Sequence, residues 1–326
     1  MAAWAAATNT GDQAPAVAQY YLIPKTAARA VPALGALAQK IEAWFLGSCF
    51  WLLGRLSPER ASTVAAAVFR WLGPRSGKAK SVRRNFAIAF PELSEQELED
   101  TCREVFGQLG MATAELIKMR QIWAERDQRL QFQIDAAARE HLQASKPTVF
   151  VTAHVGAWQL TNLISLHQNL TITTVYAAET NPIMQQMFYQ MREAFGVKLL
   201  ASEEGVRPLL RELSAGHSIG LAMDNRLDSG EPIPFFGVEA RTNITAARLA
   251  LRSGAALIPI RAQRLRPGFF KVTVYAPIVS PDPEASTQEQ AVAMTRRINE
   301  HFEEWIRETP EQWMCLKRRW PTPGKP

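Results

Sequence analysis

Residues 149–160 read Val-Phe-Val-Thr-Ala-His-Val-Gly-Ala-Trp-Gln-Leu. The β-branched, apolar run up to Thr152 is typical of a buried parallel strand, and His154 follows just where such a strand ends. Open α/β folds keep their functional side chains at this carboxyl edge of the sheet. Histidine is also the side chain best suited to accept a proton near neutral pH. The segment therefore predicts an α/β fold with His154 as a general base; the alternative is a structural histidine with satisfied hydrogen bonds.

Strand and helix patterns alternate along the rest of the chain. Strand-like runs cover residues 170–176, 197–200, 219–223, 256–262 and 269–275. Helical periods cover residues 158–167, 182–195, 206–215, 243–253 and 287–308. Further upstream, Ser94 and Glu97 form a capping box ahead of a long helix expected over 95–120. The alternation predicts right-handed crossovers and a mostly parallel sheet flanked by helices.

The amino-terminal part of the chain has a different character. Residues 1–18 are rich in alanine and small polar residues and predict a flexible leader without the features of a secretory signal. Residues 43–53 are apolar on every side, but a helix of that length falls well short of the roughly 30 Å of hydrocarbon in a bilayer. We expect residues 19–80 to form a helical region at a membrane surface, followed by an α/β domain over 81–326. A buried core helix is the alternative.

Tryptophans among basic residues favour the membrane interpretation, because indole rings lie at headgroup depth and cations face anionic lipid. The residues expected at this surface are Trp44, Trp51, Trp71, Arg55, Arg60, Arg70, Arg75, Lys78 and Lys80.

Composition limits the partners and cofactors. A formal net charge of +6 favours an anionic partner, which could be nucleic acid, acidic lipid or an acidic carrier protein. Nucleic acid is disfavoured because the bases lie among tryptophans and no recognition motif accompanies them. The cysteines, at 49, 102 and 315, have no metal-binding spacing and indicate reduced thiols on the cytoplasmic side. No GxGxxG or P-loop pattern is present, so no metal or nucleotide cofactor is expected.

Several blocks follow one another in an order that points to a family. They are Ser81–Ser94 (with Arg83-Arg84-Asn85 and Phe90-Pro91-Glu92), His154–Gln159, Arg192 ahead of Phe195-Gly196, Asp224–Gly230, Pro234–Gly237, and Pro310–Trp313 with Arg318-Arg319-Trp320. Together they resemble the bacterial late acyltransferases of lipid A biosynthesis, a branch of the lysophospholipid acyltransferase superfamily. The resemblance extends from about residue 81 to residue 320.

This resemblance implies a membrane-associated O-acyltransferase, peripheral or monotopic, at the cytoplasmic face of the bacterial inner membrane. The donor would be a thioester of acyl carrier protein or coenzyme A, the acceptor a hydroxyl of a lipid A precursor or lyso-lipid. Histidine removes the hydroxyl proton in such enzymes, so that no acyl-enzyme forms.

The resemblance also assigns roles beside that of His154. A catalytic or positioning role is implied for residue 159, Arg192 and Asp224, and substrate contacts for Trp158, Arg226, Phe235, Phe236, Arg318 and Arg319. Simpler interpretations stand beside these: packing for Trp158, a solvated helix face for Arg192, a turn for Asp224, a hydrophobic plug for the two phenylalanines, and a solvated tail for the paired arginines.

Gln159 departs from the family pattern, which places an acidic residue five positions after the histidine. An amide accepts a hydrogen bond but supplies no charge to stabilise an imidazolium ion. Three explanations are open: the charge comes from elsewhere, such as Asp224 or an acidic acceptor; the substitution inactivates the enzyme; or the chain is a non-catalytic relative. Cys315 and Lys317 stand where the family typically has Trp and His, which favours natural divergence. A lyso-aminolipid with its own acidic headgroup is the alternative acceptor, and a lipid-binding protein without activity the alternative function.

Overall fold

The computed structural model describes residues 32–144, 146–179 and 181–321. The predicted leader over residues 1–18 lies outside them. The chain divides into two compact units. One holds the described part of Met1–Cys49 together with Ala178–Tyr189, and the other holds Phe50–Ala177 and the described part of Gln190–Pro326. In the first unit, Asn181 caps the helix that begins at Pro182 and donates a 3.1 Å hydrogen bond to the carbonyl of Gln39.

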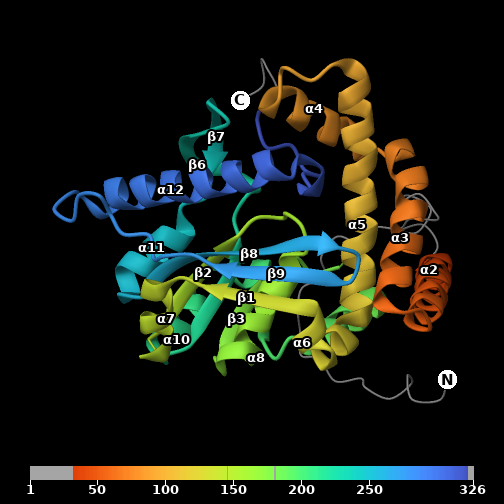
Figure 1. Ribbon diagram of the computed structural model, residues 1–326, viewed down its shortest axis with the longest axis horizontal. Coiled ribbons are helices and arrows are strands. Elements are labelled where there is room, and N and C mark those ends of the chain that lie inside the picture. The colour runs from red at the N-terminus through yellow and green to blue at the C-terminus, as the bar shows by residue number, and fades with distance from the viewer. Residues whose placement is uncertain (1–31, 145, 180, 322–326) are drawn as a thin grey trace. The chain divides into compact units, whose positions relative to one another are not determined.

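A seven-stranded sheet forms the centre of the larger unit (Figure 1). Its order is β1-β9-β8-β2-β5-β3-β4. The strands are β1 (Leu130–Ile134), β2 (Thr148–Thr152), β3 (Ile172–Tyr176), β4 (Lys198–Ala201), β5 (Ser218–Ala222), β8 (Ala256–Arg266) and β9 (Phe269–Val274). Neighbours pair in parallel except β8 and β9, which pair antiparallel. The predicted mostly parallel sheet is confirmed, and β2 is buried along its whole length between β5 and β8.

The helices agree with the predicted alternation, with some differences. They are α2 (Pro32–Gly54), α3 (Pro58–Leu72), α4 (Ala79–Ala89), α5 (Glu95–Ala124), α6 (Arg126–Arg129), α7 (Ala136–Gln143), α8 (Ile164–Gln168), α9 (Pro182–Glu193), α10 (Arg207–Ser214), α11 (Thr245–Ser253) and α12 (Thr287–Glu308). The Ser94–Glu97 capping box is present. The helix predicted over 158–167 begins as a 3₁₀ segment, Trp158–Leu163, and only then becomes α8.

A two-stranded hairpin, β6 (Arg226–Phe235) and β7 (Val238–Thr242), was not predicted. Its turn residues Phe236 and Gly237 both have positive φ, +53° and +71°, as a type I′ turn requires. Asn299 and Glu303 of α12 hold the hairpin through hydrogen bonds to the carbonyl of Pro234 and the backbone N–H of Phe236. Phe235 and Phe236 are buried in the core, which agrees with the simpler interpretation of a hydrophobic plug, while their contact with substrate stays a prediction.

The carboxyl-terminal basic edge is another correction. Arg319 was expected to contact substrate or to lie in a solvated tail, but it is 2% exposed. Its guanidinium donates hydrogen bonds to the carbonyl of Arg241 and the hydroxyl of Thr242 and lies over the ring of Phe235. Burial lowers the pKa of Arg319 to about 10. Arg318, by contrast, is exposed.

Helices α2 and α3 carry the apolar surface expected of the amino-terminal region. On α3, Ala61 and Ala65 pack against α5, where a Cβ on Gly110 would lie 2.4 Å from the Ala65 carbonyl oxygen. The opposite face exposes Val64, Val68 and Trp71. Along α2 the exposed apolar side chains are Leu34, Leu37, Ile41, Trp44, Phe45, Trp51 and Leu52. Within the described residues, no helix has the length and hydropathy needed to cross a bilayer.

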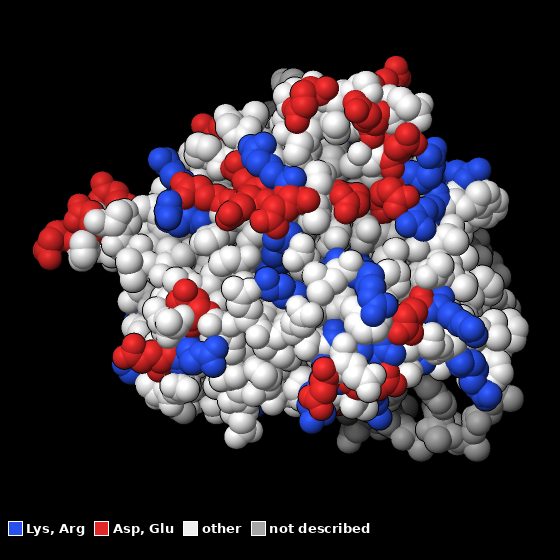
Figure 2. Space-filling model, in the orientation of Figure 1, with Lys and Arg blue, Asp and Glu red and all other residues white. Residues whose placement is uncertain are grey.

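Charge is unevenly distributed over the larger unit. Figure 2 shows acidic side chains in a band along α12. A shallow hollow on this helix is lined by Glu300, Glu303, Glu304, Arg307 and Glu308.

Arg70, expected to face lipid, instead forms a two-pronged ion pair with Glu104 of α5 at 2.7 and 2.8 Å.

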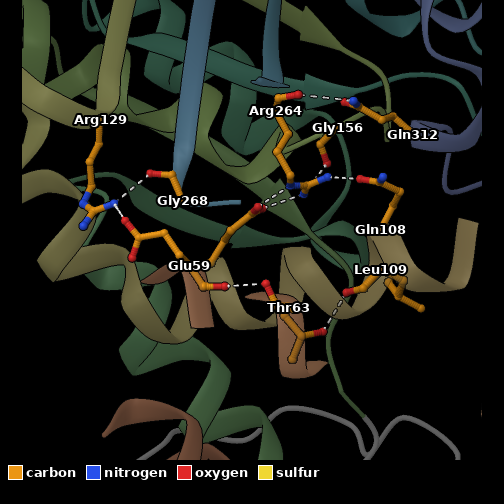
Figure 3. A network of polar contacts seen from close by, with 11 residues as sticks. Glu59, Thr63, Gln108, Leu109, Arg129, Gly156, Arg264, Gly268 and Gln312 are labelled. Carbon is orange, nitrogen blue, oxygen red and sulfur yellow. Dashed lines mark hydrogen bonds and ion pairs between the residues drawn. The ribbon is translucent and has the colours of Figure 1, made fainter. Parts of the chain in front are cut away.

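A buried ion pair ties α5 to the sheet (Figure 3). Arg264 of β8 pairs with Glu115 of α5, and both side chains are 3% exposed or less. The guanidinium also bonds the side chain of Gln108 and the carbonyl of Gly156, so each partner is satisfied. Such a pair fixes geometry, and removal of one member leaves an uncompensated buried charge.

We expect Glu115→Ala to lower the free energy of unfolding by about 3–5 kcal/mol, because Arg264 would be left buried without its counter-charge. Urea denaturation followed by tryptophan fluorescence measures this. Glu104→Ala, on the same helix, is the matched control and should cost no more than about 1 kcal/mol, because its pair with Arg70 is part-exposed. Equal effects of the two variants would contradict the central role of the buried pair.

Candidate active site

His154 and Asp224 meet at the carboxyl ends of two adjacent parallel strands. The backbone N–H of Met223 donates to the carbonyl of Thr152, which extends the β2–β5 pairing and brings the next residues side by side. Oδ1 of Asp224 lies 2.6 Å from Nδ1 of His154 and accepts a second hydrogen bond, at 3.1 Å, from the histidine's backbone N–H. The carboxylate therefore holds the imidazole by both its ring and its backbone.

Trp313 completes this arrangement from the other side. Its indole N–H donates to Oδ2 of Asp224 at 3.1 Å. The indole is itself fixed by aromatic contacts with Phe86, Phe235 and Phe236, at centroid distances of 5.7, 5.9 and 6.2 Å. With a side chain only 3% exposed, Asp224 thus has donors on both oxygens and little contact with water. Hydrogen bonds to the charged form keep such a buried carboxylate ionised.

The pKa values of the pair move in opposite directions. Burial alone would raise the pKa of Asp224, but the charge of His154 and the hydrogen bonds from His154 and Trp313 outweigh it and lower the pKa. Burial alone would lower the pKa of His154, but the charge and hydrogen bond of Asp224 outweigh it and raise the pKa. Because Nδ1 bonds a carboxylate, it carries the proton, and Nε2 is left as the basic nitrogen. The side chain of His154 is 27% exposed, so a substrate can reach it.

Gln159 does not take the place of the missing carboxylate. It lies in the 3₁₀ segment after the histidine, and its backbone carbonyl accepts a hydrogen bond from Asn162. Among the described residues, its side chain makes no hydrogen bond to His154. The carboxylate that contacts the imidazole is that of Asp224, one of the sources of charge named in the first explanation. Trp158, next to Gln159, places its ring 5.4 Å from the imidazole of His154.

The loop that carries His154 is held by the segment around Trp313. Val155 forms a bridge with Trp313, and the N–H of Met314 donates to the carbonyl of His154 at 2.8 Å. Gly156 has φ +62°, and a Cβ there would lie 2.7 Å from the carbonyl oxygen of Ala262. Only glycine fits this close approach. Figure 3 shows the side chain of Arg264 reaching the Gly156 carbonyl.

The other predicted site residues occupy separate positions. Arg192, in the last turn of α9, lies over the ring of Tyr176 at the end of β3. Arg226 forms an ion pair with Asp228 at 2.5 Å. Among the described residues, the hydrogen-bond partners of the Asp224 carboxylate are His154 and Trp313, and Arg226 is not among them. No group of three or more metal-ligating side chains occurs in the part of the chain that the structure describes.

Three residues that matter here had no role assigned from sequence: Trp313, Arg264 and Asn85. Trp313 and Asn85 stand in the quoted blocks, but an indole or an amide alone indicates no partner. For Arg264 the sequence gives a weak indication of a structural role, since an arginine in an apolar strand requires a buried counter-charge.

The model of the family described as bacterial lipid A biosynthesis acyltransferase matches residues 35–322, which is most of the chain. The chain belongs to this family. Among curated relatives, a lipid A biosynthesis acyltransferase of Haemophilus influenzae is 22% identical, covering 83% of this chain and 85% of its own length. A phosphatidylinositol mannoside acyltransferase of Mycolicibacterium smegmatis is 27% identical over 83% of this chain and 88% of its own. A lipid A biosynthesis lauroyltransferase of Escherichia coli is 28% identical, covering 75% of this chain and 79% of its own length. The resemblance inferred from the ordered blocks is confirmed, and the chain is an acyltransferase.

For this acyltransferase we expect activity to be lost as the pH falls through the raised pKa of His154, because a general base must be unprotonated. Asp224→Asn removes the charge and keeps the shape. Turnover should fall by about 10³- to 10⁴-fold. The acid limb of kcat/KM should move to lower pH, because the charge of Asp224, which raises the pKa of His154, is lost.

Initial rates between about pH 5 and about pH 9 measure both effects. Asp282→Asn, an exposed carboxylate distant in sequence, is the control and should leave profile and rate unchanged. An acid limb that stays in place in Asp224→Asn would show that this carboxylate does not act on the base.

Proposed function

We propose that this enzyme transfers a fatty acyl chain from a thioester to a hydroxyl of a lipid, with His154 as general base. The observation that carries the proposal is the chain of contacts from Trp313 through Asp224 to His154. It fixes the tautomer, stabilises an imidazolium and leaves Nε2 open to a substrate. Family membership supports acyl transfer as the reaction class.

In the proposed reaction, Nε2 of His154 takes the proton of the acceptor hydroxyl as its oxygen attacks the thioester carbonyl carbon. The tetrahedral intermediate then collapses, the C–S bond breaks and the new ester is released. The imidazolium returns its proton to the departing sulfur, so the products are an acylated lipid and a free thiol. No side chain is acylated, and Asp224 remains ionised throughout.

The acceptor is proposed to be a glycolipid or lyso-lipid of the lipid A precursor type. Relatives named for lipid A and for phosphatidylinositol mannoside acylation both support a membrane lipid with a free hydroxyl. The lyso-aminolipid alternative was motivated by the missing carboxylate at position 159. Because Asp224 occupies Nδ1 of His154, the acceptor need not bring an acidic group to orient the base.

The donor is proposed to be an acyl carrier protein or coenzyme A thioester. Both are anionic, and the acidic band along α12 (Figure 2) would repel them. We therefore propose that the donor approaches the enzyme from a side other than the one formed by α12.

Two variants test this function. His154→Ala should abolish thiol release and lipid acylation, because the proposed transfer depends on Nε2 of this imidazole to take the hydroxyl proton. Gln159→Glu should change turnover by no more than about threefold, because Nδ1 of His154 already has its carboxylate and the triad requires one. Thiol release from acyl carrier protein and coenzyme A thioesters, with mass spectrometry of the lipid product, measures both. Undiminished release by His154→Ala would overturn the mechanism; a large gain in Gln159→Glu would show that Asp224 does not suffice.

We also propose that the enzyme works on the cytoplasmic surface of the bacterial inner membrane without spanning it. On α3, the exposed Val64, Val68 and Trp71 form an apolar stripe. Two exposed tryptophans each carry an arginine over the ring: Arg55 over Trp51 at 4.5 Å and Arg75 over Trp71 at 4.8 Å. Indole rings capped by cations suit the interface between acyl chains and anionic headgroups.

Replacing Val64 and Val68 together by serine should weaken binding to anionic phospholipid vesicles by about tenfold, because two half-exposed valines lose their burial in the acyl region. Cosedimentation with vesicles measures the partition. Val238 and Val279 are also exposed but lie far from α3 in the sequence, so their double serine variant is the matched control. Equal binding by the two variants would contradict attachment through α3.

A further inference from the structure

Lys317 lies on a segment whose main chain is tied to the loop that carries His154. The N–H of Met314 bonds the carbonyl of His154, and the chain then turns tightly, with N–H bonds from Cys315 to Trp313 and from Leu316 to Met314 at 2.9 Å. Two residues separate Met314 from Lys317. The backbone of Lys317 is therefore held near His154 by main-chain contacts.

Asn85 of α4 locks this segment. Its side-chain amide donates to the carbonyls of Cys315 and Lys317, at 2.9 and 2.8 Å, and its Oδ1 accepts from the N–H of Arg319 at 3.0 Å. Asn85 itself is 1% exposed. One buried amide thus holds three points of the loop, which makes the position of Lys317 a built feature and not that of a loose tail.

The side chain of Lys317 is exposed, and no ion pair with it is formed by the described acidic residues. Its charge is close enough to His154 to lower the pKa of the imidazole, against the action of Asp224. In the free enzyme, Lys317 therefore opposes protonation of the base. An anion bound to Lys317 would remove that opposition at the moment when the hydroxyl proton is transferred.

We infer that Lys317 is a specificity-determining residue that binds an anionic group of the acceptor lipid, a phosphate or carboxylate near the hydroxyl that is acylated. The inference rests on the proposed function. We assign the anion to the acceptor because, in the proposed reaction, the acceptor's hydroxyl is the group that Nε2 of His154 deprotonates. The anion serves binding and neutralises Lys317; it does not replace Asp224.

A crossover experiment tests this inference. The acceptors are two lyso-lipids with the same acyl chain and a free hydroxyl, one with a phosphate monoester headgroup and one a neutral monoacylglycerol. For the phosphate acceptor, Lys317→Ala should raise KM by about tenfold to a hundredfold, the loss expected for one charge-assisted hydrogen bond. For the neutral acceptor, kcat/KM should stay equal or rise, since a charge that opposes the base has gone. Lys317→Arg should keep the phosphate preference.

The control is Lys146→Ala, an exposed lysine before the amino end of β2, at the opposite edge of the sheet. This variant should leave KM and kcat/KM unchanged for both acceptors. If Lys317→Ala raises the KM of the thioester instead, the anion belongs to the donor and the inference is wrong. It is also wrong if both acceptors lose activity equally.

A binding measurement separates this inference from the proposed function. In a His154→Ala background, which cannot turn over, the phosphate lyso-lipid should bind about tenfold more weakly when Lys317→Ala is added, by tryptophan fluorescence. If the unmodified protein transfers no acyl group, the proposed function fails, while a loss of binding that depends on Lys317 still supports the anion site. If transfer occurs but binding does not depend on Lys317, only the inference fails.

Discussion

A carboxylate buried almost completely, with hydrogen-bond donors on both oxygens, determines the geometry of this active site. Asp224 keeps its charge because His154 and Trp313 supply those donors, and loss of the Trp313 indole would leave Oδ2 without its donor in a poorly hydrated position. The parallel pairing of β2 and β5 brings Asp224 and His154 together. The fold therefore builds the pair from 70 residues apart in sequence, not from a local motif.

The segment after α12 makes several contacts that hold the site together. Trp313 bonds Asp224, the next N–H bonds the carbonyl of His154, and Lys317 and Arg319 follow on the loop that Asn85 holds. Arg319 is buried over Phe235, whose ring also packs on Trp313. Arg319, Phe235, Trp313 and Asp224 thus form one continuous series of contacts within the core.

Much of the fold follows from local sequence. Strand β2 and helix α12 have the predicted bounds, because each is a strong single-period run with clear ends. The β6–β7 hairpin was missed because its turn puts Phe236 at positive φ, where glycine or asparagine is the usual signal. Strand β1 was also missed; it is a five-residue run that is stabilised as a strand by pairing with β9, which is distant in sequence.

The candidate site, like the fold, could be predicted from the sequence only in part. Sequence identified His154 from its place after a strand, and Asp224 as one possible source of charge, but it could not decide between Asp224 and an acidic acceptor. That choice depends on which strands are neighbours, and strand order is a property of tertiary packing. Once β5 lies beside β2, a carboxylate two residues past its end meets the histidine two residues past the end of β2. With Asp224 on Nδ1, the imidazole of His154 has a carboxylate partner without an acidic side chain at position 159.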